Sequence, residues 1–336
     1  KPSTHDKKCV PFRTFQILAT HLYSFDMKTR ISLSLFLIVV FSGAVFAQDA
    51  GQYFAAGNEH YKAKNYTLAI ASYTSALRLA PSSYATWFNR GQCYYFTGSY
   101  AAAVNDYSQA IRLNPRYTDA LFQRGLSRNK LKDHAGAVAD YTAAIGTSPA
   151  DASIWYNRGI ANSDNGSDDA AIADYTEAIR LSPAYSKPYH NRGAIYFKQK
   201  KNAEALADMN KTISLDPANS DAWNGRALLN SRLANYDLAL TDIAQAIKLR
   251  PNYAKYYYDR GAIYSRKKMP DLAVADLNYA ISLDPKYYQP YMLRGAIRFD
   301  AKQYSLARTD LEKVLELSPG HNLATTTLAK LKALGQ

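Results

Sequence analysis

The sequence predicts an all-α protein, an α-solenoid built from eight helical hairpins. Two registers of residues predict this architecture, because proline recurs at intervals of 34 residues and alanine recurs in step with it. The prolines are Pro81, Pro115, Pro149, Pro183, Pro217, Pro251, Pro285 and Pro319, and the alanines are Ala69, Ala103, Ala137, Ala171, Ala205, Ala239, Ala273 and Ala307. Such self-similarity is typical of stacked repeats, so the length of 336 residues does not indicate two globular domains.

Each repeat is expected to contain two helices. Counted from Ala50, apolar or aromatic residues fall three and four apart within positions 4 to 12 and again within positions 20 to 28. Small residues at positions 8, 20 and 27 let the two backbones approach closely, and large residues at positions 4 and 24 fill the gaps between them. Proline at position 32 ends the second helix. One hairpin alone cannot bury both of its faces, so neighbouring repeats must stack.

Residues 1–47 are expected to precede the folded array. The first methionine is Met27, and we interpret residues 1–26 as disordered upstream read-through. From Met27 onward, two basic residues, an apolar run and small residues that end at Ala47 are typical of a secretory signal peptide, residues 27–47. We therefore expect a mature chain that begins at Gln48 and is located in the periplasm or outside the cell. Retention as a membrane anchor is the alternative, although a spanning helix needs about 20 apolar residues and this run is shorter.

The repeats that follow are expected to divide the chain at regular points. Their predicted bounds are residues 50–83, 84–117, 118–151, 152–185, 186–219, 220–253, 254–287 and 288–321. Residues 322–336 carry Leu323, Leu328, Leu331 and Leu334 at helical spacing. We predict that they form a capping helix, which gives the last repeat a solvated outer face.

The pattern of residues within a repeat resembles the tetratricopeptide repeat family. In the second repeat, the aromatic, glycine, tyrosine, alanine, aromatic, alanine and proline positions of that family are filled by Trp87, Gly91, Tyr94, Ala103, Tyr107, Ala110 and Pro115. The resemblance covers residues 50–321. It implies a right-handed superhelix, an inner groove lined by the first helix of each hairpin, and a function in binding other proteins.

One departure from the family pattern concerns charged residues at positions 7 and 23. Arginine at position 7 and aspartate at position 23 occur together in repeats two to eight, whereas the first repeat has Ala56 and Ser72. We predict a structural ladder of ion pairs between the two helix layers. Its first four pairs are Arg90 with Asp106, Arg124 with Asp140, Arg158 with Asp174, and Arg192 with Asp208.

A peptide-binding groove is expected along the first five repeats. There, aromatic side chains at positions 5 and 12 alternate with amides at position 6: rings supply apolar contact, and amides can both donate to and accept from an extended backbone. The candidate groove residues are Phe54, Phe88, Asn89, Tyr95, Phe122, Gln123, Tyr156, Asn157, His190 and Asn191. The alternative is that these aromatic rings pack between repeats as core. The lysine and asparagine pair with which some family members hold a terminal carboxylate is absent from positions 5 and 9.

A second candidate surface is basic. Position 15 is lysine in the odd-numbered repeats, at Lys64, Lys132, Lys200 and Lys268, with Gly98, Gly166 and Ala234 between them. Joined by Lys62, Lys201, Lys267 and Lys302, these lysines are expected along one edge, where they can meet an anionic surface. The alternative is that they are solvated turn residues. A basic edge would suit a structural element of the cell envelope that contacts anionic membrane or wall polymers.

Composition and motifs exclude several other functions. The chain is 47% hydrophobic and contains 28 tyrosines, which indicates a folded protein. Its net charge of +13 falls to +9 without residues 1–47, which carry six basic and two acidic residues. Cys93 is the single cysteine of the expected mature chain, and no metal-binding or catalytic motif is found. We expect no enzymatic activity, no cofactor and no metal, a protein or peptide partner and no nucleic acid, with membrane or wall contact as a weaker expectation.

Overall fold

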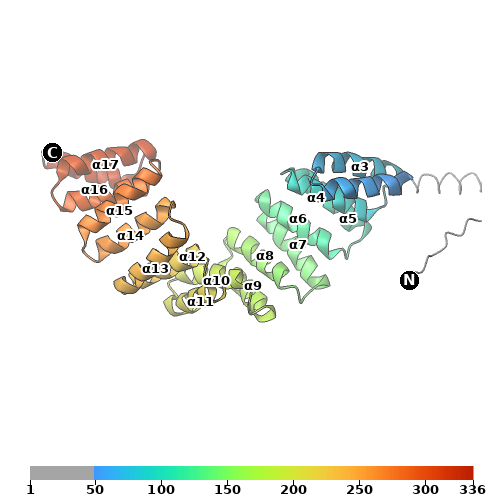
Figure 1. Cartoon of the computed structure of the whole chain (residues 1–336), viewed down its shortest axis with the longest axis horizontal. Coiled ribbons are helices and arrows are strands. Elements are labelled where there is room, and N and C mark those ends of the chain that lie inside the picture. Colours follow the sequence, from blue (N-terminus) through green and yellow to red (C-terminus); the bar gives the residue numbers. More distant parts are fainter. Residues whose placement is uncertain (1–48, 336) are drawn as a thin grey trace, which may run out of the picture. The chain divides into compact units, whose positions relative to one another are not determined.

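The protein is described by a computed structural model that covers residues 49–335, so the predicted read-through segment 1–26 and signal peptide 27–47 lie outside the described residues. Within 49–335 the chain is helical throughout and has no strand (Figure 1). The predicted all-α solenoid of helical hairpins is confirmed. The chain divides between Asp140 and Tyr141 into two compact units, and each is treated by itself.

The helices follow one another in pairs. Residues 49–62 are helical, and α3 (Tyr66–Leu79), α4 (Tyr84–Phe96), α5 (Tyr100–Leu113), α6 (Thr118–Lys130) and α7 (His134–Thr147) follow. The chain continues with α8 (Ala152–Asp164), α9 (Asp168–Leu181), α10 (Ser186–Lys198), α11 (Asn202–Leu215), α12 (Ser220–Arg232), α13 (Tyr236–Leu249), α14 (Ala254–Arg266), α15 (Pro270–Leu283), α16 (Tyr288–Asp300), α17 (Tyr304–Leu317) and α18 (Asn322–Ala333). Even numbers from α4 to α16 are first helices of a repeat, and odd numbers are second helices. None of the helices within residues 49–335 is both long and apolar enough to cross a bilayer.

The ends of the helices follow from local residue types. The residue before a proline is pushed out of the helical region, and Asn114 before Pro115 accordingly has φ −137° and ψ 91°. Three first helices begin at a side chain that caps them, because Ser83, Asp151 and Asn219 each accept a hydrogen bond from a backbone N–H of the first turn. These capping residues fall 68 residues apart, so repeats two to seven alternate between two types of helix start, whereas α16 of repeat eight follows Tyr287, which makes no capping bond.

The turn between the two helices of a repeat needs a left-handed residue at position 15. Gly98 and Gly166 have φ of 78° and 80° there, which glycine adopts without strain. The same place is held with positive φ by Lys64, Lys132, Lys200, Ala234, Lys268 and Lys302. A side chain in this conformation costs about 1 kcal/mol or more. Backbone geometry therefore favours glycine over lysine, and it does not explain the lysines.

The core of each hairpin joins a small residue of the first helix to a large residue of the second. Tyr107 is completely buried, and a Cβ atom on Gly91 would lie only 2.8 Å from its ring. The same contact joins Gly57 to Tyr73 and Gly159 to Tyr175. In repeats five to eight the tyrosine is replaced by Met209, Ile243, Leu277 and Leu311. Ala227 replaces the glycine in repeat six, where it packs in one cluster with Ile243.

All seven arginine and aspartate pairs of positions 7 and 23 form bidentate ion pairs. The closest nitrogen-to-oxygen distances lie between 2.6 and 2.8 Å. The aspartates are at most 7% exposed. The pairs are Arg90–Asp106, Arg124–Asp140, Arg158–Asp174, Arg192–Asp208, Arg226–Asp242, Arg260–Asp276 and Arg294–Asp310. Each pair links the first helix of a repeat to its second helix.

Most of these arginines also reach the repeat before their own. Nη1 of Arg90 donates to Thr74 at 2.9 Å, and Nη1 of Arg226 donates to Asn210 at 2.7 Å. The partners of the other arginines at this place are Ser108, Thr142, Thr176 and Asn278. The first repeat has no repeat before it, which gives a physical reason why it carries Ala56 instead of arginine.

Candidate functional site

Phe88 was expected in the groove, and the structure places it in the core. It is 8% exposed, and its ring centre lies 5.7 Å from that of Tyr107 and 4.9 Å from that of Tyr117. Tyr117, the last residue of the same repeat, packs against the side of the ring that we expected to be open. The expectation that Phe88 lines an open groove is therefore wrong, because little of its surface is left for a ligand.

The other rings of position 5 are half-buried. Tyr156 packs against Tyr175 and Tyr185, at ring distances of 5.9 and 5.0 Å. Phe54 contacts Tyr73 at 5.9 Å and lines a cavity of about 250 Å³ together with small side chains of repeats one and two. Phe122 is half-buried as well. These rings therefore fit the alternative expectation that the aromatic residues of position 5 pack as core. Only part of their surface is left for contact with a partner.

The amides of position 6 lie next to tyrosine hydroxyls from the preceding repeat. Nδ2 of Asn89 and the hydroxyl of Tyr73 both donate to Oδ1 of Asn58, at 3.1 and 2.8 Å. Nδ2 of Asn191 lies 3.4 Å from the hydroxyl of Tyr156 and 3.5 Å from that of Tyr175. The amide nitrogens of Asn89 and Asn191 therefore donate hydrogen bonds within the fold, while their amide oxygens are in part left for other contacts.

Two of the predicted amides have other surroundings. Asn157 donates to the backbone oxygen of Ser153 in its own helix at 2.8 Å, which leaves it less free to bind an extended backbone. Gln123 is half-buried.

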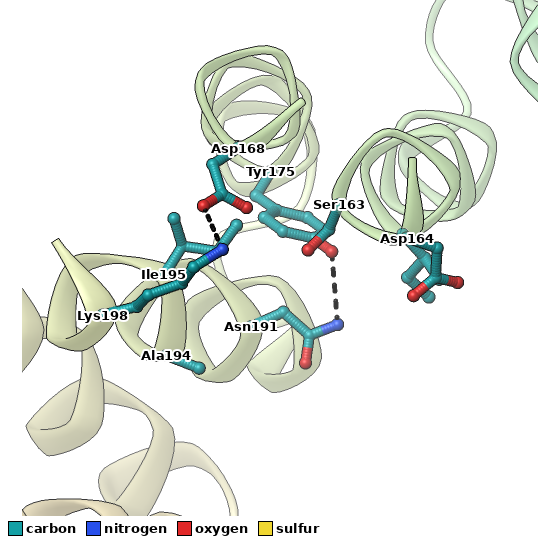
Figure 2. Close-up of a pocket in the computed structure, with 9 residues that line it drawn as sticks. Ser163, Asp164, Asp168, Tyr175, Asn191, Ala194, Ile195 and Lys198 are labelled. Atoms are coloured by element: carbon teal, nitrogen blue, oxygen red, sulfur yellow. Dashed lines mark hydrogen bonds and ion pairs between the residues drawn. The ribbon is translucent and has the colours of Figure 1, made fainter. Parts of the chain in front are cut away.

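A pocket of about 350 Å³ lies between the first helices of repeats four and five (Figure 2). Its walls come from α8 and α10, and α9 contributes Asp168 and Tyr175. The remaining lining residues are Ile160, Ser163, Asp164, Asn191, Ala194, Ile195 and Lys198. Of the candidate groove residues, only Asn191 lines this pocket. The rest of its lining comes largely from positions 9, 12 and 13 of the first helices.

The pocket combines charged, polar and apolar groups. Nζ of Lys198 pairs with Oδ2 of Asp168 at 2.7 Å, and this ion pair links repeats four and five across one side of the pocket (Figure 2). Burial raises the pKa of Tyr175, an effect that Asn191 partly opposes, so the phenol stays protonated. Tyr175 and Ile195 are only 1% and 5% exposed. The ammonium of Lys198 can donate to a ligand, the oxygens of Asn191 and Asp164 can accept, and the half-buried Ile160 adds apolar surface.

Tyr95 belongs to an aromatic cluster at the turn between α4 and α5. Its ring lies 5.8 Å from that of Phe96 and 5.4 Å from that of Tyr100. Phe96 stacks on Tyr66 at 5.2 Å and remains 54% exposed. The aromatic residues at positions 12, 13 and 17 form this cluster. The sequence alone does not show that they meet, because their contacts depend on how the turn folds.

His190 occupies position 5 of repeat five, where the earlier repeats have rings of phenylalanine or tyrosine. Its Nδ1 is buried and has no hydrogen-bond partner among the described residues. Burial lowers the pKa of His190 below its ordinary value of 6.5, and the carboxylate of Asp221 opposes this only in part. The folded protein therefore favours the neutral ring.

We expect acid to destabilise the protein through His190. Because the pKa is lower in the folded state than in the unfolded state, the stability present above about pH 6.5 is lost as the pH falls towards the folded pKa. His190→Tyr, which copies Tyr156, should remove this step. The urea midpoints of both proteins should be measured between about pH 7.5 and 5.5. An identical acid-induced decrease in the two proteins would contradict the assignment.

The described residues offer little for nucleophilic or metal chemistry. No group of three His, Cys, Asp or Glu side chains within residues 49–335 could hold a metal ion. Cys93 is buried, and burial raises the pKa of its thiol to about 11. The thiol is therefore protonated at neutral pH, which makes it a poor nucleophile.

Comparison with known proteins gives the same family along most of the array. Profiles described as tetratricopeptide repeat match residues 54–115, 94–152, 186–219, 220–253 and 254–287, and one described as TPR repeat matches residues 163–200. No curated protein matches the sequence.

Solved structures with a similar fold come from several proteins. A tetratricopeptide repeat protein from Parabacteroides merdae has a TM-score of 0.61 and 21% identity, over 74% of this chain and 98% of that chain. The APC/C hetero-tetramer Cut9–Hcn1 gives a TM-score of 0.59 at 18% identity, over 79% of this chain and 52% of that chain. PilF of Pseudomonas aeruginosa gives 0.55 at 18% identity, over 65% and 97%. These structural matches show a shared fold, and the profiles establish that the chain belongs to the tetratricopeptide repeat family.

Proposed function

We propose that this chain is an exported scaffold that holds an extended peptide segment of a partner protein along its first helices. The observation that carries the proposal is the pocket between α8 and α10. It is about 350 Å³ in volume, it is lined by the first helices of two consecutive repeats, and it combines hydrogen-bonding groups with the apolar surface of Ile160. The family to which the chain belongs generally serves as a protein-binding scaffold, and we propose no catalytic activity.

The chemistry of the pocket suits a peptide better than a small rigid ligand. A peptide backbone offers an alternation of N–H donors and C=O acceptors, and the pocket presents both kinds of partner. Asn191 and Asp164 supply acceptors, while Lys198 supplies a donor. Pockets that bind small molecules are mostly apolar and enclosed. This one is open along the helices, so a chain can enter and leave it.

Export is the second part of the proposal. It is supported by the pattern of residues 27–47, in which a basic start, an apolar run and small residues follow one another. We propose that the functional chain begins at Gln48. Mass spectrometry of the N-terminus of the protein purified from its own cells tests this, and a chain that retains Met27 would contradict cleavage.

The pocket is tested by a substitution that fills it. Ala194 is exposed and lines the pocket, so Ala194→Arg should block it without disturbing the core. The probe is a set of peptides selected from a random-peptide library on the chain from Gln48. We expect Ala194→Arg to weaken their binding about tenfold or more, which corresponds to about 1.4 kcal/mol. Isothermal titration calorimetry gives the dissociation constants.

Ala262→Arg is the matched control, since Ala262 holds the same position on α14 in repeat seven. It adds the same side chain at a distance from the pocket and should leave binding unchanged. The proposal fails if the library yields no binding peptide. It also fails if Ala194→Arg binds as the parent does, or if both variants lose binding equally.

A further inference from the structure

Large apolar side chains are exposed where the first helix of repeats six and seven turns into the second. Leu233 follows α12, and Met269 precedes α15; they are 41% and 37% exposed. Leu238 and Leu272, each the third residue of a second helix, are 59% and 44% exposed. None of the four belongs to a buried cluster. Exposed apolar side chains that gather on one surface typically mark a site of interaction with a protein or a membrane.

Lysines lie beside these apolar side chains. Lys200 and Lys201 occupy the turn of repeat five, and Lys268 occupies the turn of repeat seven next to Met269. All three are exposed, and none has an ion-pair partner among the described residues. Lys200 and Lys268 hold positive φ, a conformation for which repeats two and four use glycine. The fold would therefore be served better by glycine, so the lysine charge needs another explanation.

The three turns form one continuous strip. Nη1 of Arg232 donates to the backbone oxygen of Phe197 at 2.7 Å, which joins the turn of repeat six to that of repeat five. Lys267 pairs with Asp237 and joins the turn of repeat seven to repeat six. We call this strip, with the four apolar and three basic residues above, the turn edge. Asp237 is neutralised by its partner, whereas Asp271 and, on the turn of repeat five, Glu204 are carboxylates without an ion pair among the described residues.

We propose that the turn edge binds the surface of an anionic lipid bilayer. Lysines attract the headgroups, and apolar side chains of the same strip enter the boundary between headgroups and acyl chains. A soluble polyanion, such as a wall polymer or a nucleic acid, needs only the cations. It would leave Leu233, Leu238, Met269 and Leu272 in water. The exposed apolar side chains therefore favour lipid over polymer.

Sedimentation with vesicles tests the proposal. The chain from Gln48 is used, because it omits the apolar run of residues 31–46 and keeps all the described residues. We expect it to bind vesicles of phosphatidylglycerol, less so at high salt, and not to bind vesicles of phosphatidylcholine. The triple variant Lys200→Gln, Lys201→Gln, Lys268→Gln should bind phosphatidylglycerol about a hundredfold more weakly, since each lysine near such a surface contributes about a factor of five.

Two further variants distinguish lipid from other anions. Leu233→Ser, Leu238→Ser, Met269→Ser should lose vesicle binding and retain binding to soluble polyglutamate. Lys286→Gln, Lys330→Gln, Lys332→Gln removes the same charge elsewhere, and Leu323→Ser with Leu334→Ser removes apolar surface from α18; both should bind vesicles as the parent does. Circular dichroism shows that each variant is folded.

The result that would overturn the proposal is equal vesicle binding by the parent and the lysine variant, or equal losses in the control variants. Unchanged vesicle binding in the serine variant would also overturn it, because the edge would then be a site for polyanions. The outcome is independent of the peptide pocket, since none of the substituted residues lines it.

Discussion

Asp174→Ala is expected to lower the free energy of unfolding by roughly 3–5 kcal/mol, the largest effect of any single substitution considered for this chain. The carboxylate of Asp174 is buried and accepts hydrogen bonds from Nε and Nη2 of Arg158, as well as one from Asn162. Its removal leaves a guanidinium that is only 19% exposed without a counter-charge. Urea unfolding followed by circular dichroism measures the loss.

The double variant Arg158→Met, Asp174→Leu separates the ion pair from its packing. A buried ion pair gains little net free energy, because desolvation of both charges offsets most of their attraction. Two apolar side chains of similar size should therefore be tolerated much better than the single deletion. If Asp174→Ala and the double variant lost the same stability, it would be wrong that each charge of the ladder is required because its partner is present.

Gly91→Ala should be the second most damaging change, with a loss of about 1–3 kcal/mol. The new Cβ would lie 2.8 Å from the ring of Tyr107, which is fully buried and also packs against Phe88. A buried ring cannot move aside without disturbing its other neighbours. The melting temperature of the variant should fall, even though alanine is intrinsically favoured over glycine in a helix by about 1 kcal/mol.

The chain itself supplies the controls for this prediction. In repeat six the same position is already Ala227, and the residue opposite is Ile243. Gly91→Ala combined with Tyr107→Ile copies that pair and should recover most of the lost stability. At Gly261 the new Cβ would lie 3.2 Å from the backbone oxygen of Ala273 and from Cγ of Leu277, which is a longer contact than the one at Gly91, so Gly261→Ala should cost less than Gly91→Ala. A larger loss at Gly261 would mean that the ring contact is not what requires glycine.

The sequence was sufficient to predict the repeat architecture, because each helix is specified by several residues at once. Proline ends the second helix, small residues mark where helices touch, and these signals recur in each of eight repeats. An atypical residue at one position therefore does not change the predicted architecture, because the other positions still indicate it. The paired charges of positions 7 and 23 were equally readable, since they appear and disappear together. Their additional bond to the preceding repeat was not predicted, because position 25 varies among Thr, Ser, Asn and Ala in repeats one to seven.

The groove was predicted less well. The aromatic residues of position 5 were placed on the correct helix, but the exposure predicted for Phe88 was wrong. Its ring is covered by Tyr117, and the sequence does not show which ring covers which. A second signal was present and unused. Tyr73, Tyr107, Tyr141 and Tyr175 lie sixteen residues before Asn89, Gln123, Asn157 and Asn191; the tyrosines end with repeat four and the amides with repeat five. The pocket itself depends on positions 9, 12 and 13, whose residue types vary among the repeats.

The bond from arginine to the preceding repeat has one gap. Arg260 meets Ala244 at position 25, and alanine has no side-chain group that can accept. The stability of a repeat array is a sum of each repeat and its nearest-neighbour interfaces, and the junction between repeats six and seven lacks the arginine bond that the other junctions have. Fluctuations that detach repeats seven and eight with α18 as one block should begin at this seam. The proposed lipid-binding edge crosses it, so a bilayer surface would hold together the two sides of the seam.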